Sequence, residues 1–168
     1  ERSLELSRKT DGAFDITLYP VSELWGFYSD SQQVPGKTEL AAALQHVGIE
    51  HCYMERDSVT LDAGTKLDLG AIAKGYTSAR AAEVLQEAGV TSANLSLGGN
   101  IHVIGTKPDG SDWTVAIANP KDTNRYAGTL KVRDTAVVTS GGYQRFFEED
   151  GTVYHHILNP KTGYPADS

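Results

Sequence analysis

Hydrophobic residues in the first half of the chain recur mostly three or four positions apart. This spacing is typical of helices with one apolar face, which often begin at a polar cap or a proline and end before a glycine. We expect Thr38 to cap the third such helix and Gly48 to end it in the left-handed conformation. The pattern predicts helices over residues 1–10, from Pro20 onward and over 39–47, followed by a hairpin over 52–64 that turns at Asp57-Ser58.

A longer helix is expected after a very short strand at residues 66–69. Its apolar positions follow the helical period, so one of its faces should be buried, and Gly89 should end it. The residues assigned to that buried face are Ile72, Tyr76, Ala79, Ala82 and Leu85.

From Ala93 onward the hydrophobic period changes to two, which indicates strands. Turns are expected at Pro108-Asp109-Gly110 and at Asp150-Gly151. Helices early in the chain and strands late favour an α+β fold with a mixed or antiparallel sheet, here a single domain that can divide into two lobes. The predicted strands cover residues 93–99, 100–106, 113–119, 128–134, 136–140, 143–149 and 152–158.

Composition excludes several classes of partner. The chain has 15 Lys and Arg against 22 Asp and Glu, a net charge of -7, and its basic residues are scattered. Binding to nucleic acid or to an anionic membrane surface is therefore not expected, because both depend on concentrated positive charge. Cys52 is the only cysteine, which excludes an internal disulfide. Glu1 begins within an expected helix, and the chain stops just after a turn, so we expect a fragment truncated at both ends.

The segment LDLGAIAKGY, residues 67–76, is the first candidate for chemistry. A strand that ends at Asp68 and runs into a helix at Gly70 would bring a carboxylate and free N–H groups to one point. Lys74 would lie near the positive end of the helix dipole, a position that an anionic ligand would stabilise. The simpler interpretation, equally open from the residues alone, is that Asp68 only caps the helix.

The segment HHILNPKTGYP, residues 155–165, is the second candidate. In a strand His155 and His156 would point to opposite faces, so at most one of them can face a site. The following turn from Asn159 to Gly163 should be rigid and could hold its backbone groups ready for a ligand. A surface or packed histidine is the simpler interpretation, and a plain core is the simpler one for Trp25 and Phe27.

Five segments, in order, resemble one family, the ApbE flavin transferases (FAD:protein FMN transferases). The resemblance covers nearly the whole chain, and we treat residues 1–168 as a partial ApbE-like domain. The segments are TDGAFDITLYPVSELWGF at 10–27, LDLGAIAKGYTSARA at 67–81, LSLGGNIHVIG at 95–105, VVTSGGYQRFFEEDG at 137–151 and HHILNPKTGYP at 155–165.

The resemblance implies an Mg²⁺-dependent enzyme that splits FAD, releases AMP and attaches FMN to a Thr or Ser hydroxyl of an acceptor protein, such as a subunit of a redox-driven ion pump. His156 falls on the family's proposed catalytic histidine. The carbonyl of Ala71 would ligate Mg²⁺. The segment Trp25-Gly26-Phe27 would line the flavin or nucleotide pocket. Contacts with FAD are implied for Asp68, Lys74 and Leu158.

The resemblance also has departures and alternatives. Asn159 stands where the family has an aspartate, and His155, expected to point outward, stands where it has a serine. The family's Asp and Thr ligands of Mg²⁺ would come after the last residue, Ser168. Two further functions stay open: an FAD pyrophosphatase that yields FMN and AMP, and a noncatalytic flavin-binding module. By resemblance the protein would be a lipoprotein on the outer face of a bacterial membrane, although a cytoplasmic location is also compatible with the sequence.

Overall fold

The computed structural model describes residues 1–167, and Ser168, the last residue of the expected domain, lies outside the described residues. The chain divides into two compact units, each with its own packing. Unit 1 comprises Glu1–Ala71 and Gly142–Ser168, and unit 2 comprises Ile72–Gly141.

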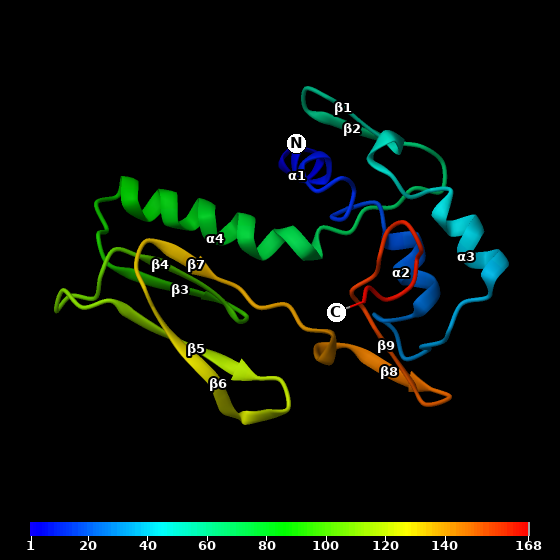
Figure 1. Cartoon of the computed structure of the whole chain (residues 1–168). Coiled ribbons are helices and arrows are strands. Elements are labelled where there is room, and N and C mark those ends of the chain that lie inside the picture. The colour runs from blue at the N-terminus through cyan, green and yellow to red at the C-terminus, as the bar shows by residue number, and fades with distance from the viewer. Residues whose placement is uncertain (168) are drawn as a thin grey trace. The chain divides into compact units, whose positions relative to one another are not determined.

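Unit 1 joins the beginning of the chain to its end (Figure 1). β1 pairs antiparallel with β2, and β8 pairs antiparallel with β9. Its elements are α1 (Arg2–Lys9), α2 (Tyr19–Trp25), α3 (Lys37–Leu44), the 3-10 turn η1 (Ile49–His51), β1 (Cys52–Glu55), β2 (Ser58–Leu61), the 3-10 turn η2 (Gly142–Gln144), β8 (Phe146–Glu149) and β9 (Thr152–His155).

The core of unit 1 forms around Trp25, whose side chain is fully buried. Val21, Phe27, Leu40 and Leu158 complete the buried cluster. Burial of each aliphatic side chain of this kind contributes about 1.5–3 kcal/mol, so this cluster is the main local source of stability.

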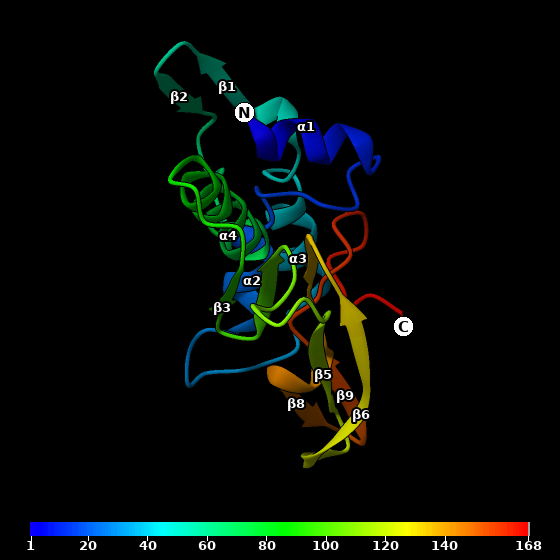
Figure 2. The ribbon, with the colours of Figure 1, turned by 90° about the vertical axis from the view of Figure 1, so that its left-hand side faces the viewer.

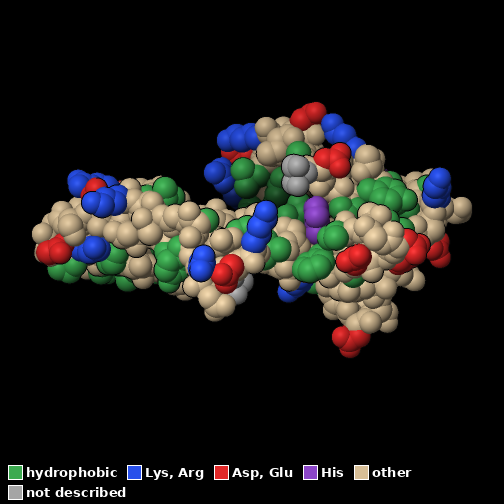
Figure 3. Space-filling view, turned by 60° about the horizontal axis from the view of Figure 1, so that its bottom comes forward, with side chains coloured by type: hydrophobic (Ala, Val, Ile, Leu, Met, Phe, Trp, Pro, Cys, Tyr) green, Lys and Arg blue, Asp and Glu red, His purple; other side chains and the backbone are tan. Residues whose placement is uncertain are grey.

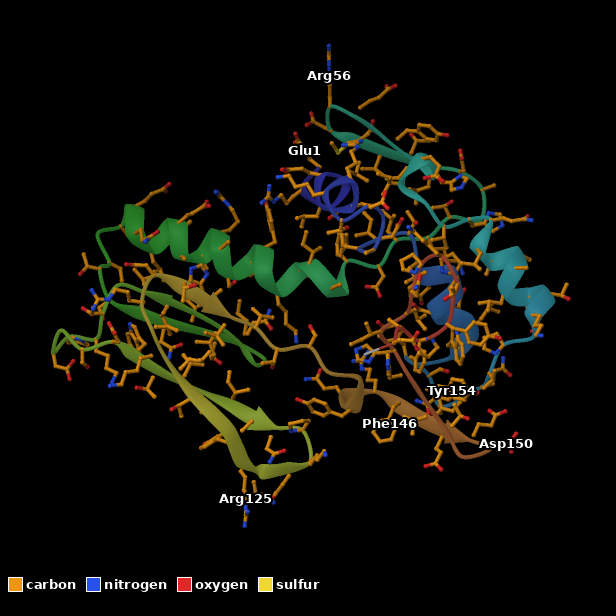
Figure 4. The ribbon with its side chains drawn as sticks, viewed as in Figure 1. Glu1, Arg56, Arg125, Phe146, Asp150 and Tyr154 are labelled. Carbon is orange, nitrogen blue, oxygen red and sulfur yellow. The ribbon has the colours of Figure 1, made fainter. Side chains whose placement is uncertain are left out.

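Aromatic side chains from the two ends of the chain meet in this core. The ring of Trp25 lies 5.2 Å from the ring of Tyr154 and 5.6 Å from that of Tyr164, centre to centre. Tyr154 projects from β9 toward α2 (Figure 4). The indole Nε1 of Trp25 also donates a 2.7 Å hydrogen bond to the carbonyl oxygen of Gly163. The turn that follows β9 is therefore fixed directly to α2.

Unit 2 contains a helix, a three-stranded sheet and a hairpin. Figures 1 and 2 show α4 running alongside the sheet, whose strand order is β3-β4-β7. All of its pairings are antiparallel, and β5 and β6 form the separate hairpin. The elements are α4 (Gly70–Glu87), whose first two residues belong to unit 1, β3 (Ala93–Leu97), β4 (Asn100–Ile104), β5 (Trp113–Asn119), β6 (Asp122–Val132) and β7 (Thr135–Val137).

The limits of α3 differ from the prediction. The helix begins at Lys37 after Gly36, so Thr38 lies inside the first turn and does not cap it. The Glu39 carboxylate instead accepts a 3.3 Å hydrogen bond from the N–H of Gly36. Gly48 does not end the helix, because the helix stops at Leu44 and Gly48 has a φ of 140° outside the left-handed helical region. Its N–H is held by the buried hydroxyl of Thr17, at 2.7 Å, a tertiary contact that local pattern does not reveal.

Three further predictions are wrong in detail. Residues 66–69 form no strand, since the only pairing there is a single bridge between Leu18 and Lys66. Tyr76 is 54% exposed, because it lies about 200° around α4 from the buried Ser78. The first hairpin turns at Arg56-Asp57, one residue earlier than expected, with Glu55 opposite Ser58.

The strands after Ala93 and the turns at Gly110 and Gly151 confirm the period-two interpretation, although several limits differ: β6 begins at Asp122, β8 begins after η2, and β9 ends at His155, before His156. Helices with antiparallel strands confirm the α+β class. Charged side chains of both signs are scattered over the face drawn in Figure 3. Within residues 1–167, no helix is both long enough and apolar enough to cross a membrane.

Candidate active site

His156 lies immediately after β9 and is held by the main chain of Arg145. The carbonyl oxygen of Arg145 is 3.1 Å from the main-chain nitrogen of His156 and 3.2 Å from its Nδ1. A carbonyl oxygen only accepts, so the hydrogen-bonded Nδ1 must carry the proton. In the neutral imidazole Nε2 is then the unprotonated nitrogen, with a lone pair that can accept a proton.

The electrostatic setting of His156 favours its neutral form. Partial burial is the main cause that lowers the pKa of His156 below 6.5, and the nearby positive charge of Arg145 acts in the same direction. The hydrogen bond to the Arg145 carbonyl opposes the shift without reversing it. The imidazole is therefore neutral near pH 7, the state that a general base requires.

His155 has a different role from His156. It pairs with Phe146 across the β8–β9 hairpin, and its ring packs against Gly142. A Cβ atom added to Gly142 would lie 2.8 Å from the imidazole, closer than side chains pack. The expectation that His155 points outward is therefore wrong, because the ring fills the space that a glycine leaves in the turn before β8.

Arg145 connects the histidine to the segment after α2 through an aromatic ring. Its guanidinium carbon lies 4.8 Å from the centre of the Tyr28 ring, within the range of a cation–π interaction. The hydroxyl of Tyr28 in turn donates a 3.2 Å hydrogen bond to Oδ2 of Asp68. Burial and the Asp68 carboxylate both raise the pKa of the Tyr28 phenol above 10, so it is protonated and able to donate.

The structure supports the interpretation that Asp68 caps α4. Its Oδ1 accepts a 2.7 Å hydrogen bond from the N–H of Gly70, the first residue of α4. Its own N–H donates to the carbonyl of Ile16 at 2.7 Å, which fixes the segment entering the helix. Together with Tyr28, these contacts engage both carboxylate oxygens, so Asp68 caps α4 and anchors Tyr28. A contact between Asp68 and FAD stays a prediction.

Lys74 belongs to unit 2, where it faces the turn between β3 and β4. Its Nζ lies 3.4 Å from the carbonyl oxygen of Gly98. Gly98 and Gly99 have φ values of 55° and 95°, which a tight hairpin requires and side chains disfavour. A Cβ at Gly99 would meet no atom within 4 Å, so the surface beside this lysine is open. A role for Lys74 in holding FAD stays a prediction.

Trp25, Phe27 and Leu158 lie in the core of unit 1, where they are 0%, 4% and 7% exposed. Gly26 between the two aromatic residues has a φ of 69° and ends α2 in the left-handed conformation. The simpler interpretation of Trp25 and Phe27 as core residues is thus confirmed. Direct contacts of these residues with a ligand stay predictions.

Asn159 shapes the turn after His156 as an aspartate would. Its Oδ1 accepts a 2.9 Å hydrogen bond from the N–H of Lys161, and its N–H donates to the carbonyl of Tyr164 at 2.8 Å. An amide oxygen suffices for this contact, so the missing charge leaves the turn geometry intact.

The residues described do not by themselves fit an Mg²⁺ site. Within residues 1–167, no three His, Cys, Asp or Glu side chains gather where they could hold a metal ion. Mg²⁺ prefers six oxygen ligands in near-octahedral geometry, whereas the expected ligand here is one main-chain carbonyl, that of Ala71. One carbonyl oxygen falls far short of this ligand set.

Two members of this site, Tyr28 and Arg145, were missed by sequence reasoning. Arg145 lies within the quoted segment VVTSGGYQRFFEEDG and Tyr28 directly follows LWGF, so both were close to recognised motifs. No periodic pattern links residues that are more than a hundred positions apart. Only the fold brings the Tyr28 ring under the Arg145 guanidinium.

An α+β domain that holds a neutral imidazole with one free nitrogen beside an arginine defines a candidate acid–base site. The chain belongs to the ApbE family, whose model matches residues 1–168.

Several named proteins are similar to the chain. It is 38% identical over 184 residues to an FAD:protein FMN transferase of Treponema pallidum, covering 99% of this chain and 51% of the relative. It is 35% identical over 162 residues to one of Klebsiella pneumoniae, covering 94% of this chain and 49% of the relative. The chain thus spans about half the length of these curated relatives.

Solved structures agree with these matches. The crystal structure of the ApbE protein from Thermotoga maritima superposes with a TM-score of 0.88 at 35% identity, over 98% of this chain and 55% of that one. The flavin transferase ApbE from Vibrio cholerae gives a TM-score of 0.81 at 35% identity, over 98% and 53% of the two chains. A variant of the latter in which a histidine is replaced by glycine also matches, with a TM-score of 0.80.

Proposed function

We propose that the protein containing this chain transfers the FMN half of FAD to a Thr or Ser hydroxyl of an acceptor protein and releases AMP. The observation that carries the proposal is the state of His156: Nδ1 is fixed on the Arg145 carbonyl and Nε2 is free. The choice of FAD as the substrate is supported by the similar proteins that are named FAD:protein FMN transferases.

His156 acts on the proton of the acceptor. The acceptor oxygen attacks the phosphorus of the FMN half, forming one P–O bond while the pyrophosphate P–O bond to AMP breaks. The hydroxyl proton moves to Nε2 of His156, and AMP leaves with the bridging oxygen. A neutral imidazole suits this task, because the low pKa of His156 keeps Nε2 unprotonated near pH 7.

Positive groups are needed to offset the charge of the dinucleotide on a protein of net charge -7. The guanidinium of Arg145 lies close enough to His156 to affect its pKa, and Lys74 stands at an open glycine turn. We propose that Lys74 contacts FAD. Mg²⁺ dependence is also part of the proposal, with Ala71 as the one ligand assigned within this chain.

The acceptor protein and the cellular location that we propose are those implied by the resemblance to the ApbE family. The acceptor would be a flavoprotein with a Thr or Ser modification site, such as a subunit of a redox-driven ion pump. We also propose an extracytoplasmic lipoprotein.

The test is to incubate the protein with FAD, Mg²⁺ and a candidate acceptor. A transferase makes the acceptor fluorescent in a denaturing gel, because the flavin is covalently attached. Free FMN and AMP without labelling of the acceptor would instead indicate an FAD pyrophosphatase. Binding of FAD with neither product would indicate a noncatalytic flavin-binding module.

A further inference from the structure

A row of four side chains links α4 to the turn that carries His156. From Asp68 the row passes through the Tyr28 hydroxyl, across the Tyr28 ring to the Arg145 guanidinium, and through the Arg145 main chain to the imidazole. Each step is a direct contact within unit 1.

We infer that Tyr28 and Arg145 are positioning residues that fix His156 in its Nδ1–H tautomer and so keep Nε2 free. This inference rests on the proposed function for its catalytic consequence, but the tautomer itself is a property of the protein alone.

The main chain and the side chain of Arg145 have different roles in this arrangement. Its carbonyl accepts from both the main chain and the ring of His156, so the position of residue 145 sets the position of the imidazole. Its side chain is held on the Tyr28 ring. The stack therefore restrains the residue whose carbonyl selects the tautomer.

Tyr28 is well suited to hold the arginine. Its hydroxyl is bound to Asp68, which is itself fixed to Gly70 and to Ile16. The preceding residues, Gly26 and Phe27, are buried in the core of unit 1. The Tyr28 ring is thus anchored at both ends, although it is 52% exposed, and it presents a fixed surface to the guanidinium.

Without this restraint the imidazole would be free to exchange its proton between the two nitrogens. Free histidine favours the Nε2–H tautomer, in which Nε2 cannot accept a proton. Loss of the stack should therefore move a fraction of the molecules into a form that cannot act as the base, even when FAD is bound.

Two variants separate the role of the Tyr28 ring from that of its hydroxyl, and a third variant serves as the control. Tyr28→Leu removes both the ring and the hydroxyl, and Tyr28→Phe keeps the ring. Tyr53→Leu is the matched control, because Tyr53 is 51% exposed and its hydroxyl also donates to an aspartate, Asp62, on the β1–β2 hairpin. A thermal melt of each variant checks that it is folded.

The primary measurement is the ¹⁵N spectrum of the His156 ring nitrogens above pH 7, without FAD or acceptor. We expect the Nδ1–H tautomer in the unchanged protein, in Tyr28→Phe and in Tyr53→Leu, and a mixture in Tyr28→Leu. An unchanged tautomer in folded Tyr28→Leu would overturn the inference, whatever the outcome of the flavin-transfer assay.

The second measurement is a double-mutant cycle on the rate of flavin transfer. We expect Tyr28→Leu and Arg145→Gln each to lower kcat roughly 10-fold, since small displacements of a catalytic group are costly. The double variant should be little worse than either, because both changes break one stack. Effects that simply multiply would contradict a shared role and leave the proposed function standing.

Discussion

The carbonyl oxygen of Arg145 holds His156 through two hydrogen bonds, one from its main-chain N–H and one from its ring Nδ1. One acceptor thereby fixes both the position of the residue and the nitrogen that bears the proton. The arrangement leaves Nε2 as the one basic atom of the ring, which is the atom that our account assigns to proton transfer.

Replacing Arg145 by glutamine should move the acid limb of the pH profile of kcat/KM upward. Burial first, and the arginine charge in addition, lower the pKa of His156 from 6.5, so loss of that charge must raise it. His155, the other titratable group acting on the imidazole, is unchanged by this substitution. The measurement is kcat/KM for flavin transfer between pH 5 and 8.

Arg145→Lys is the matched control for this prediction, because it keeps the positive charge and the main-chain carbonyl. Its acid limb should stay below pH 6.5, with that of the unchanged protein. If the acid limb of Arg145→Gln moves downward or does not move, the charge of Arg145 does not lower the pKa of His156.

Gly142→Ala should impair flavin transfer by displacing the turn that carries Arg145. A new Cβ would lie 2.8 Å from the His155 ring, and we expect η2 to shift to relieve the contact. We expect a loss of stability of about 1–3 kcal/mol, as for other overpacked sites, and a lower kcat. Urea unfolding and a transfer assay measure the two effects.

Gly128→Ala on β6 provides the control for Gly142→Ala, since a Cβ there would meet nothing within 4 Å. It should change the free energy of unfolding and kcat very little. If the two alanine variants have the same stability and the same kcat, the His155 ring moves to make room for the new Cβ and η2 does not shift.

Features of the fold and the site that depend on residues close in sequence could be predicted, whereas features that depend on contacts between distant residues could not. The turns at Gly110 and Gly151 and the helix over 70–87 arise from local backbone preferences, and they were predicted. The cap of α3 and the conformation of Gly48 were not, because Gly36 and the buried Thr17 decide them. His156 was identified by resemblance, whereas its tautomer depends on a carbonyl eleven residues earlier.

Asp68→Asn and Asp68→Ala should separate capping from ligand binding. Asparagine caps helices about as well as aspartate, whereas alanine costs about 0.5–2 kcal/mol. If Asp68 contacts FAD through its charge, both variants should bind FAD more weakly, and only the alanine variant should be less stable. Titration with FAD and thermal unfolding of the apoprotein measure these effects, and unchanged affinity in both would confine Asp68 to capping.

Trp25→Phe should destabilise the core more than its small loss of apolar surface suggests. The carbonyl of Gly163 would lose the indole donor at 2.7 Å in a buried position. An unsatisfied buried acceptor costs about 1–3 kcal/mol, to which the smaller ring adds a cavity. Urea denaturation of the two proteins gives the difference, and a loss well below 1 kcal/mol would mean that water or another donor replaces the indole.

The most direct test of the central claim compares flavin transfer and FAD binding in a single substitution, His156→Ala. Transfer should fall by at least about 100-fold, the usual contribution of a general base, while the affinity for FAD is largely kept. His51→Ala, which changes a histidine bonded to Asp62 beside the β1–β2 hairpin, should retain full activity. Undiminished in-gel fluorescence of the acceptor with His156→Ala would contradict the account.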